Sequence, residues 1–165
     1  MNTTTYLLRV SDGKLVTAVF KETRISKKEK NWLFDWSRPS RYGFIVLNLI
    51  ADKRIQGRVA LKPNADWNAY EIDIAETALR NRGHRDGTGK AYQGVGTALF
   101  AEVVRRSLSD GFGGYVTFVA KTELMQYYYD TLGALHIGNG RMVIDSTAAK
   151  KLLTEKTWRL DNNEL

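Results

Sequence analysis

Two glycines one residue apart, Gly94 and Gly96, precede an amphipathic segment and give this sequence its clearest chemical signal. Glycine tolerates a positive φ and has no Cβ, so a ligand can approach the backbone closely at such a turn. A helix that begins at Gly96 would direct its free N–H groups and the positive end of its dipole toward that ligand. The spacing therefore predicts an anion site, most naturally one for phosphate.

Other residue types limit the chemistry. The chain has no cysteine, which excludes a disulfide framework, a thiol nucleophile and a cysteine-based zinc site. His84 and His136 are far apart in the sequence, so we expect ordinary surface or core roles for them and no metal site. Trp32, Phe34 and Trp36 stand at alternate positions, which indicates core residues or the wall of a binding pocket.

Size and charge set wider limits. The 165 residues predict one domain over 1–165 with a substantial core. Lys and Arg exceed Asp and Glu by 25 − 18 = 7, which fits a solvated surface or attraction to a polyanionic cofactor, nucleic acid or an acidic acceptor. The basic residues are scattered, with one run at 27–30, so charge alone favours none of these, and nucleic acid stays possible without being favoured. No signal peptide or membrane span is recognised, so we expect a cytoplasmic protein without a membrane partner.

Apolar periodicity predicts the elements that position these residues. The expected strands span 5–10, 15–20, 42–51, 55–61, 69–78, 115–120, 135–137 and 141–144. The expected helices span 26–36, 96–109, 122–132 and 146–153, and a Gly-rich loop covers 80–90. Several adjacent strands form hairpins, and one strand–helix–strand unit is expected, so the fold class is a mixed α/β sheet.

The C-terminal two thirds resembles the GNAT superfamily of acyl-CoA-dependent N-acetyltransferases. The segment Gly94-Val95-Gly96-Thr97-Ala98-Leu99-Phe100 is similar to the family's Gly-Ile-Gly-Thr-Ala-Leu-Leu. A second segment, Tyr128-Tyr129-Asp130-Thr131-Leu132-Gly133-Ala134, resembles the family's Tyr-x-x-Leu-Gly-Phe ending. The resemblance implies a mostly antiparallel central sheet flanked by helices. It also implies acetyl-CoA as cosubstrate and direct acetyl transfer to a primary amine through a tetrahedral intermediate.

The resemblance assigns the coenzyme-binding residues. The backbone amides expected to hold the pyrophosphate are those of Gln93, Gly94, Val95, Gly96 and Thr97. The strand edge at Thr77 and Ala78 is expected to pair with the pantetheine arm. Arg82-Gly83 resembles the first half of the family's Gln/Arg-x-x-Gly-x-Gly/Ala motif, separated from Gly94 by an insertion over 84–93. Arg82 is then either a phosphate contact or a solvated loop residue, and a frame shifted to Gln93 is the alternative.

The resemblance also suggests catalytic groups. Tyr128 is expected to protonate the leaving thiolate, with Tyr129 as its substitute. Glu71 is the expected base, and Glu76 is a second candidate nearer the loop on the opposite strand face. The alternatives are a tyrosine packed in the core, half-exposed carboxylates without a catalytic role, and a reaction with no dedicated base.

Three functions remain open at this stage. The first is an acetyltransferase acting on a primary amine whose identity the chain does not reveal. The second is a coenzyme A-binding module with weak or no turnover. The third is an acetyltransferase whose acceptor is linked to RNA, such as an aminoacyl-tRNA. A homodimer is compatible with the resemblance.

Overall fold

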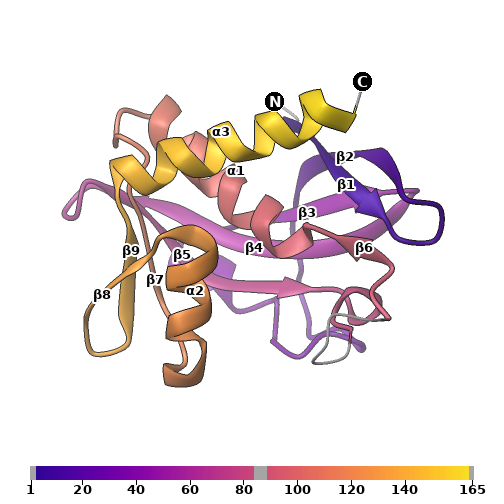
Figure 1. The fold of residues 1–165 in the computed structure, drawn as a ribbon. Helices are drawn as coiled ribbons and strands as arrows, with labels where there is room; N and C mark the ends of the chain where they lie inside the picture. The colour runs from indigo at the N-terminus through magenta and orange to yellow at the C-terminus, as the bar shows by residue number, and fades with distance from the viewer. Residues whose placement is uncertain (1–2, 84–88, 164–165) are drawn as a thin grey trace. The chain divides into compact units, whose positions relative to one another are not determined.

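A computed structural model describes the backbone of residues 3–83 and 89–163, and side chains as far as residue 155. The described residues form two compact units, one within Met1–Ala60 and Ile74–Leu99 and one within Leu61–Asp73 and Phe100–Leu165. The strands are mostly antiparallel, as expected from the resemblance, and helices accompany them (Figure 1). The mixed α/β class predicted from the sequence is confirmed.

The first unit contains a run of neighbouring strands in the order β6-β1-β2-β3-β4-β5. Their bounds are β1 Thr3–Arg9, β2 Lys14–Thr23, β3 Ile45–Ala51, β4 Arg54–Asn64, β5 Ala69–Thr77 and β6 Tyr92–Gln93, with the far end of β4 and the start of β5 in the second unit. Strand β1 pairs antiparallel with both β2 and β6. Asp52 and Lys53 join β3 to β4 with φ of 51° and 63°, the two positive values that a tight hairpin turn requires.

The prediction of a helix over residues 26–36 is wrong. The segment between β2 and β3 contains turns and one short 3-10 helix, η1, at Pro39–Tyr42. Asn31 has a φ of 72°, and the amides of Leu33 and Phe34 donate to a side-chain carboxylate instead of to backbone carbonyls. Side-chain acceptors compete with helical hydrogen bonds in this way, and here they win.

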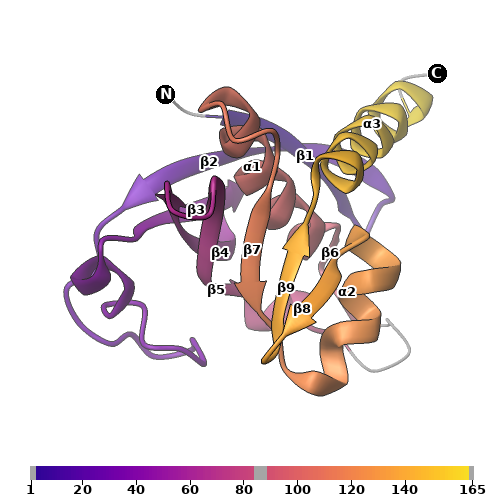
Figure 2. The same cartoon turned by 90° about the vertical axis from the view of Figure 1, so that its left-hand side faces the viewer.

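The second unit contains the far end of β4 and the start of β5. Strands β7, β9 and β8 follow β5 in the order of pairing. The added elements are α1 Val95–Ser109, which begins in the first unit, β7 Val116–Val119, η3 Thr122–Leu124, α2 Met125–Leu132, β8 Leu135–Gly138, β9 Arg141–Ile144 and α3 Ser146–Asn163 (Figure 2). Strand β7 pairs parallel with β5, Tyr70 opposite Val116 and Glu71 opposite Thr117. This is the expected strand–helix–strand unit, because α1 connects the two strands.

Buried apolar side chains stabilise each unit separately. In the first unit Trp36, Phe44, Val46 and Ala60 form a cluster. In the second unit, the fully or nearly fully buried side chains include Val103, Val104, Val116, Phe118, Met142 and Ile144. None of the described helices combines the length and apolar character that a membrane span requires.

Candidate functional site

The Gly94–Gly96 turn has the geometry of an anion site. Gly94 has a φ of 87°, and its carbonyl accepts the amide of Ala98 at 2.9 Å, so helix α1 begins at Val95, one residue earlier than expected. The amides of Val95, Gly96 and Thr97 therefore have no acceptor within the helix. A Cβ at Gly94 or Gly96 would meet no described atom within 4 Å, so the space before the helix is open to a ligand.

Hydrogen bonds join the two ends of the loop that leads to this turn. The amide of Ala91 donates to the carbonyl of Arg80 at 2.9 Å, and the amide of Tyr92 donates to Oδ1 of Asn81 at 3.0 Å. Asn81 is buried and donates in turn to the backbone and side-chain oxygens of Gln56, both at 3.0 Å. Of the insertion expected over 84–93, residues 84–88 lie outside the described part of the chain. The last two residues of the insertion form β6, a strand that the sequence did not predict.

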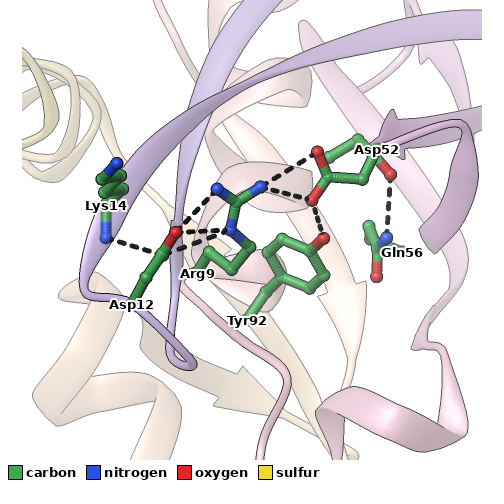
Figure 3. Close-up of polar contacts among 7 residues, drawn as sticks. Arg9, Asp12, Lys14, Asp52, Gln56 and Tyr92 are labelled. Atoms are coloured by element: carbon green, nitrogen blue, oxygen red, sulfur yellow. Dashed lines mark hydrogen bonds and ion pairs between the residues drawn. The ribbon is translucent and has the colours of Figure 1, made fainter.

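A charged network fixes β6 from the other side. The Tyr92 hydroxyl donates to the carboxylate of Asp52, and Arg9 donates to Asp52 at 3.1 Å and to Asp12 at 2.8 Å (Figure 3). The hydrogen bond from Tyr92 holds the pKa of Asp52 below its usual value, and that from Arg9 lowers the pKa of Asp12 to about 2. Both carboxylates are therefore charged at neutral pH. The network holds Tyr92 two residues before the glycine turn.

Glu76 lies on β5 with its side chain 3% exposed and its oxygens fully engaged. Its carboxylate accepts the amides of Leu33 at 2.8 Å and Phe34 at 3.1 Å, and the indole N–H of Trp36 at 3.0 Å. Nη2 of Arg82 completes the set at 2.5 Å. This geometry favours a structural role for Glu76 over a role as base, and it gives Arg82 an ion-pair partner within the protein.

Strand β4 packs against the start of α1 at Gly57 and lies beside the end of β5 there. A Cβ built on Gly57 would lie 2.9 Å from Cγ1 of Val95 and 3.3 Å from the carbonyl oxygen of Glu76. The amide of Ala78 is bonded to the carbonyl of Gln56 at 2.9 Å, whereas Thr77 ends the strand half-buried. The first unit thus brings together the expected coenzyme-binding residues Thr77, Ala78, Arg82, Gln93, Gly94, Val95, Gly96 and Thr97.

In the second unit, Tyr128 lies within an aromatic cluster. Its ring centroid is 5.1 Å from that of Phe118, 5.6 Å from that of Phe100 and 5.5 Å from that of Tyr127. Burial raises the pKa of the Tyr128 hydroxyl, and the neighbouring Tyr127 raises it further. The hydroxyl is therefore protonated at neutral pH, the state that a general acid needs.

The Tyr128 hydroxyl makes no hydrogen bond to the described residues. Because none of their buried side-chain oxygens lacks a partner, this oxygen is not completely buried. Tyr129 has 55% of its surface exposed, and its carbonyl accepts the amide of Gly133, which ends α2 with a φ of 67°. The packing favours Tyr128 over Tyr129 as a positioned proton donor.

Glu71 has few partners by comparison. Its side chain is half-buried, and Nδ2 of Asn64 approaches Oε2 at 3.3 Å. Nearby in the same unit, Arg141 donates to Oγ1 of Thr117 at 3.2 Å and stacks on Trp67 at 4.3 Å. Sequence reasoning missed Arg141 and Trp67, because only the pairing of β7 with β9 places Arg141 beside these residues. No group of metal-ligating side chains occurs among the described residues.

Solved structures of known proteins resemble this chain. The AtaT toxin, solved as a tyrosine-to-phenylalanine mutant bound to the C-terminus of the antitoxin AtaR, is 14% identical. The match covers 84% of this chain and 98% of that chain with a TM-score of 0.58. A nourseothricin acetyltransferase is 14% identical over 87% of this chain and 86% of that chain, with a TM-score of 0.44. A candidate streptothricin acetyltransferase from Bacillus anthracis, solved with acetyl coenzyme A, is 16% identical over 87% and 83%, with a TM-score of 0.49.

No protein-family model and no curated protein sequence matches the chain. The structural similarity is therefore a similarity of fold. The chain has the fold of the GNAT acetyltransferases, as its resemblance to that superfamily predicted.

Proposed function

We propose that this protein is an acetyl-CoA-dependent N-acetyltransferase that acts on a primary amine. The observation that carries the proposal is the open turn at Gly94 and Gly96, which presents the first amides of α1 on a GNAT fold. Three N–H groups without helical acceptors, at the positive end of a 15-residue helix, suit a pyrophosphate. The GNAT-like fold and the resemblance of the segment from Gly94 to Phe100 to that superfamily support the class of reaction.

The amides of Val95, Gly96 and Thr97 bind the pyrophosphate in this proposal. The positive φ of Gly94 turns the chain into the helix. Gln93 lies in β6, which pairs with β1 and positions the start of this turn. Thr77 and Ala78, at the end of β5, are the residues assigned to the pantetheine arm. Arg82 acts through Glu76, its ion-pair partner, and fixes the backbone on which the loop begins.

Tyr128 is the residue to which we assign protonation of the departing thiolate. Its hydroxyl is protonated at neutral pH and is not completely buried, and its ring packs against Phe100 and Phe118. Tyr129 is the substitute, with a looser setting. A positioned general acid of this kind contributes roughly 10²- to 10⁴-fold to the rate.

Glu71 is the proposed base, because its lone pairs are less occupied than those of Glu76. A carboxylate can accept the proton of an ammonium group directly or through one water molecule. Transfer then requires the free amine to attack the thioester carbonyl and the thiolate to leave with a proton. No covalent enzyme intermediate is needed.

The test is calorimetric titration of the protein with acetyl-CoA. We expect saturable binding that is lost in Gly96→Glu, because the added carboxylate occupies the open space and repels phosphate. Thr17→Glu, an exposed position on β2, is the matched control for charge and should bind as the unaltered protein does. No binding by the unaltered protein at millimolar acetyl-CoA would overturn the proposal.

A second acceptor class is an amine carried on RNA, such as an aminoacyl-tRNA. The net charge of +7 is compatible with it, since a basic protein attracts a polyanionic acceptor. Thiol release measured over a panel of small amines, peptides and aminoacyl-tRNA distinguishes the acceptors. Binding of acetyl-CoA without thiol release from any of them would instead indicate an inactive coenzyme-binding module.

A further inference from the structure

The segment between β2 and β3, residues 24–42, is more basic than the rest of the chain. It contains Arg24, Lys27, Lys28, Lys30, Arg38 and Arg41 but only the acids Glu29 and Asp35, a net charge of 6 − 2 = +4 out of +7. All six basic side chains are exposed, and none forms an ion pair with the described residues. We call residues 24–42 the β2–β3 segment.

Both acidic side chains of the segment already have hydrogen-bond or ion-pair partners within the protein. Glu29 accepts Nη1 of Arg58, a buried residue of β4, at 2.7 Å. Asp35 accepts the amide of Ser37 at 3.0 Å and its hydroxyl at 2.5 Å, and these bonds hold its pKa below the usual value. The charges of Arg41 and Lys28 lower that pKa further, so both cations lie near this one carboxylate. The surface charge of the segment is therefore positive.

The backbone beneath these cations is fixed. Glu76 binds the amides of Leu33 and Phe34, and Trp36 is 1% exposed in the core cluster. The Trp32 ring stacks against the guanidinium of Arg58 at 4.3 Å. Figure 2 shows the segment, in purple, as a loop that extends from the ends of β2 and β3. Contacts from Glu76 of β5 and Arg58 of β4 thus anchor a segment that has little regular structure.

Large apolar side chains project from this fixed segment. Leu33 is 70% exposed, Phe34 40% and Tyr42 62%, although the same backbone buries Trp36. The Arg38 guanidinium lies 6.0 Å from the centre of the Tyr42 ring. Exposed rings among cations suit a strand of nucleic acid, because phosphates attract the cations while unstacked bases stack on the rings.

From this arrangement we propose that the β2–β3 segment binds single-stranded RNA. Lys27, Lys28, Lys30 and Arg41 contact phosphates, and Phe34 and Tyr42 stack on bases. An acidic protein would satisfy the cations but would leave the ring faces without flat partners. The proposal does not depend on acetyl transfer, and its test needs no coenzyme.

The test measures fluorescence anisotropy of a labelled 15-nucleotide single-stranded RNA of mixed sequence at 50 and 200 mM salt. We expect binding that weakens with salt and falls at least tenfold in the triple variant Lys27→Glu, Lys28→Glu, Lys30→Glu. Loss of three phosphate contacts should also reduce the salt slope by about 2, since each contact contributes roughly 0.7 for a single strand.

The matched control has the same change in net charge at three exposed lysines elsewhere, Lys14→Glu, Lys121→Glu and Lys150→Glu. It should lose less than threefold in affinity. Phe34→Leu keeps an apolar side chain but removes the ring, and it should weaken binding severalfold. Circular dichroism confirms that each variant folds.

Three results would overturn the proposal. They are no RNA binding at 50 mM salt, an equal loss in the two triple variants, and unchanged affinity in Phe34→Leu. Stronger binding to vesicles of anionic lipid or to a polyglutamate peptide would assign the surface to those partners instead. Failure of acetyl-CoA binding leaves this test unaffected.

Discussion

The two ends of strand β5 give chemically identical side chains opposite environments. At one end Glu71 is half-buried and has one amide contact at 3.3 Å from Asn64. At the other end Glu76 is buried and accepts three N–H groups and one guanidinium. The first carboxylate has few partners among the described residues, whereas the second connects β5 to the β2–β3 segment. The lesson is that the donors around a carboxylate, more than its place on a strand, decide what it does.

The largest expected effect tests the structural end of this comparison. Glu76→Ala leaves the buried indole N–H of Trp36 and two backbone amides without an acceptor, so we expect the free energy of unfolding to fall by about 3 kcal/mol. Urea denaturation measures it. The matched variant Glu71→Ala should change stability by less than about 0.5 kcal/mol, as is usual for a surface site. Equal losses in the two variants would remove the distinction between the two carboxylates.

The next effect concerns the packing of β4 against α1. Gly57→Ala adds a Cβ that would lie 2.9 Å from Cγ1 of Val95, so overpacking should cost about 2 kcal/mol. Gly96→Ala, in open space within the helix, should be neutral or stabilise by up to about 1 kcal/mol. Thermal unfolding of both variants checks the contrast. A stable Gly57→Ala protein would show that the contact of β4 with α1 is loose.

The dependence of stability on pH tests Tyr70, the neighbour of Glu71 on β5. Burial, together with a hydrogen bond to Asp110, raises the pKa of Tyr70 from 10.0 to about 12. The unfolded state loses this proton first, so the stabilisation is complete below pH 10 and is lost as the pH rises to about 12. Tyr92 and Tyr128 also have raised pKa values, so Tyr70→Phe is compared with the unaltered protein.

We expect the Tyr70→Phe protein to lose about 1 kcal/mol less stability between pH 9 and pH 11.5 than the unaltered protein. Urea midpoints at the two pH values measure the difference. An identical pH dependence in both proteins would mean that Tyr70 gains nothing from its contact with Asp110.

The smallest expected change in stability comes from Glu71→Gln, which preserves the contact with Asn64 and should alter unfolding by less than about 0.5 kcal/mol. If Glu71 is the base, kcat at neutral pH should nevertheless fall by about 10²-fold, while the affinity for acetyl-CoA remains unchanged. Steady-state thiol release with a responsive amine provides the measurement. Unchanged kcat would reduce Glu71 to a half-exposed strand carboxylate, the alternative that the sequence left open.

Local patterns in the sequence were sufficient for most elements. The Asp52-Lys53 hairpin turn, helix α1 and the glycine that ends α2 follow rules that act within a few residues, and the structure confirms them. The expected helix over 26–36 was wrong, because Glu76 takes amides more than forty positions away in the chain. Strand β6 was missed for a similar reason, since its two residues form a strand only by pairing with β1.

By itself, the sequence determined that a helix begins next to Gly94 and that the fold is a mixed α/β sheet, and its resemblance to the GNAT superfamily predicted the family of folds. Backbone freedom and apolar periodicity are properties of neighbouring residues, so they can be read without a structure. Tertiary structure alone decided that Glu76 is surrounded by donors and that Tyr128 is packed among aromatic rings. It also decided that the cations of the β2–β3 segment lie on a fixed backbone. Hydrogen-bond partners and burial come from residues distant in sequence, and only the folded chain brings them together.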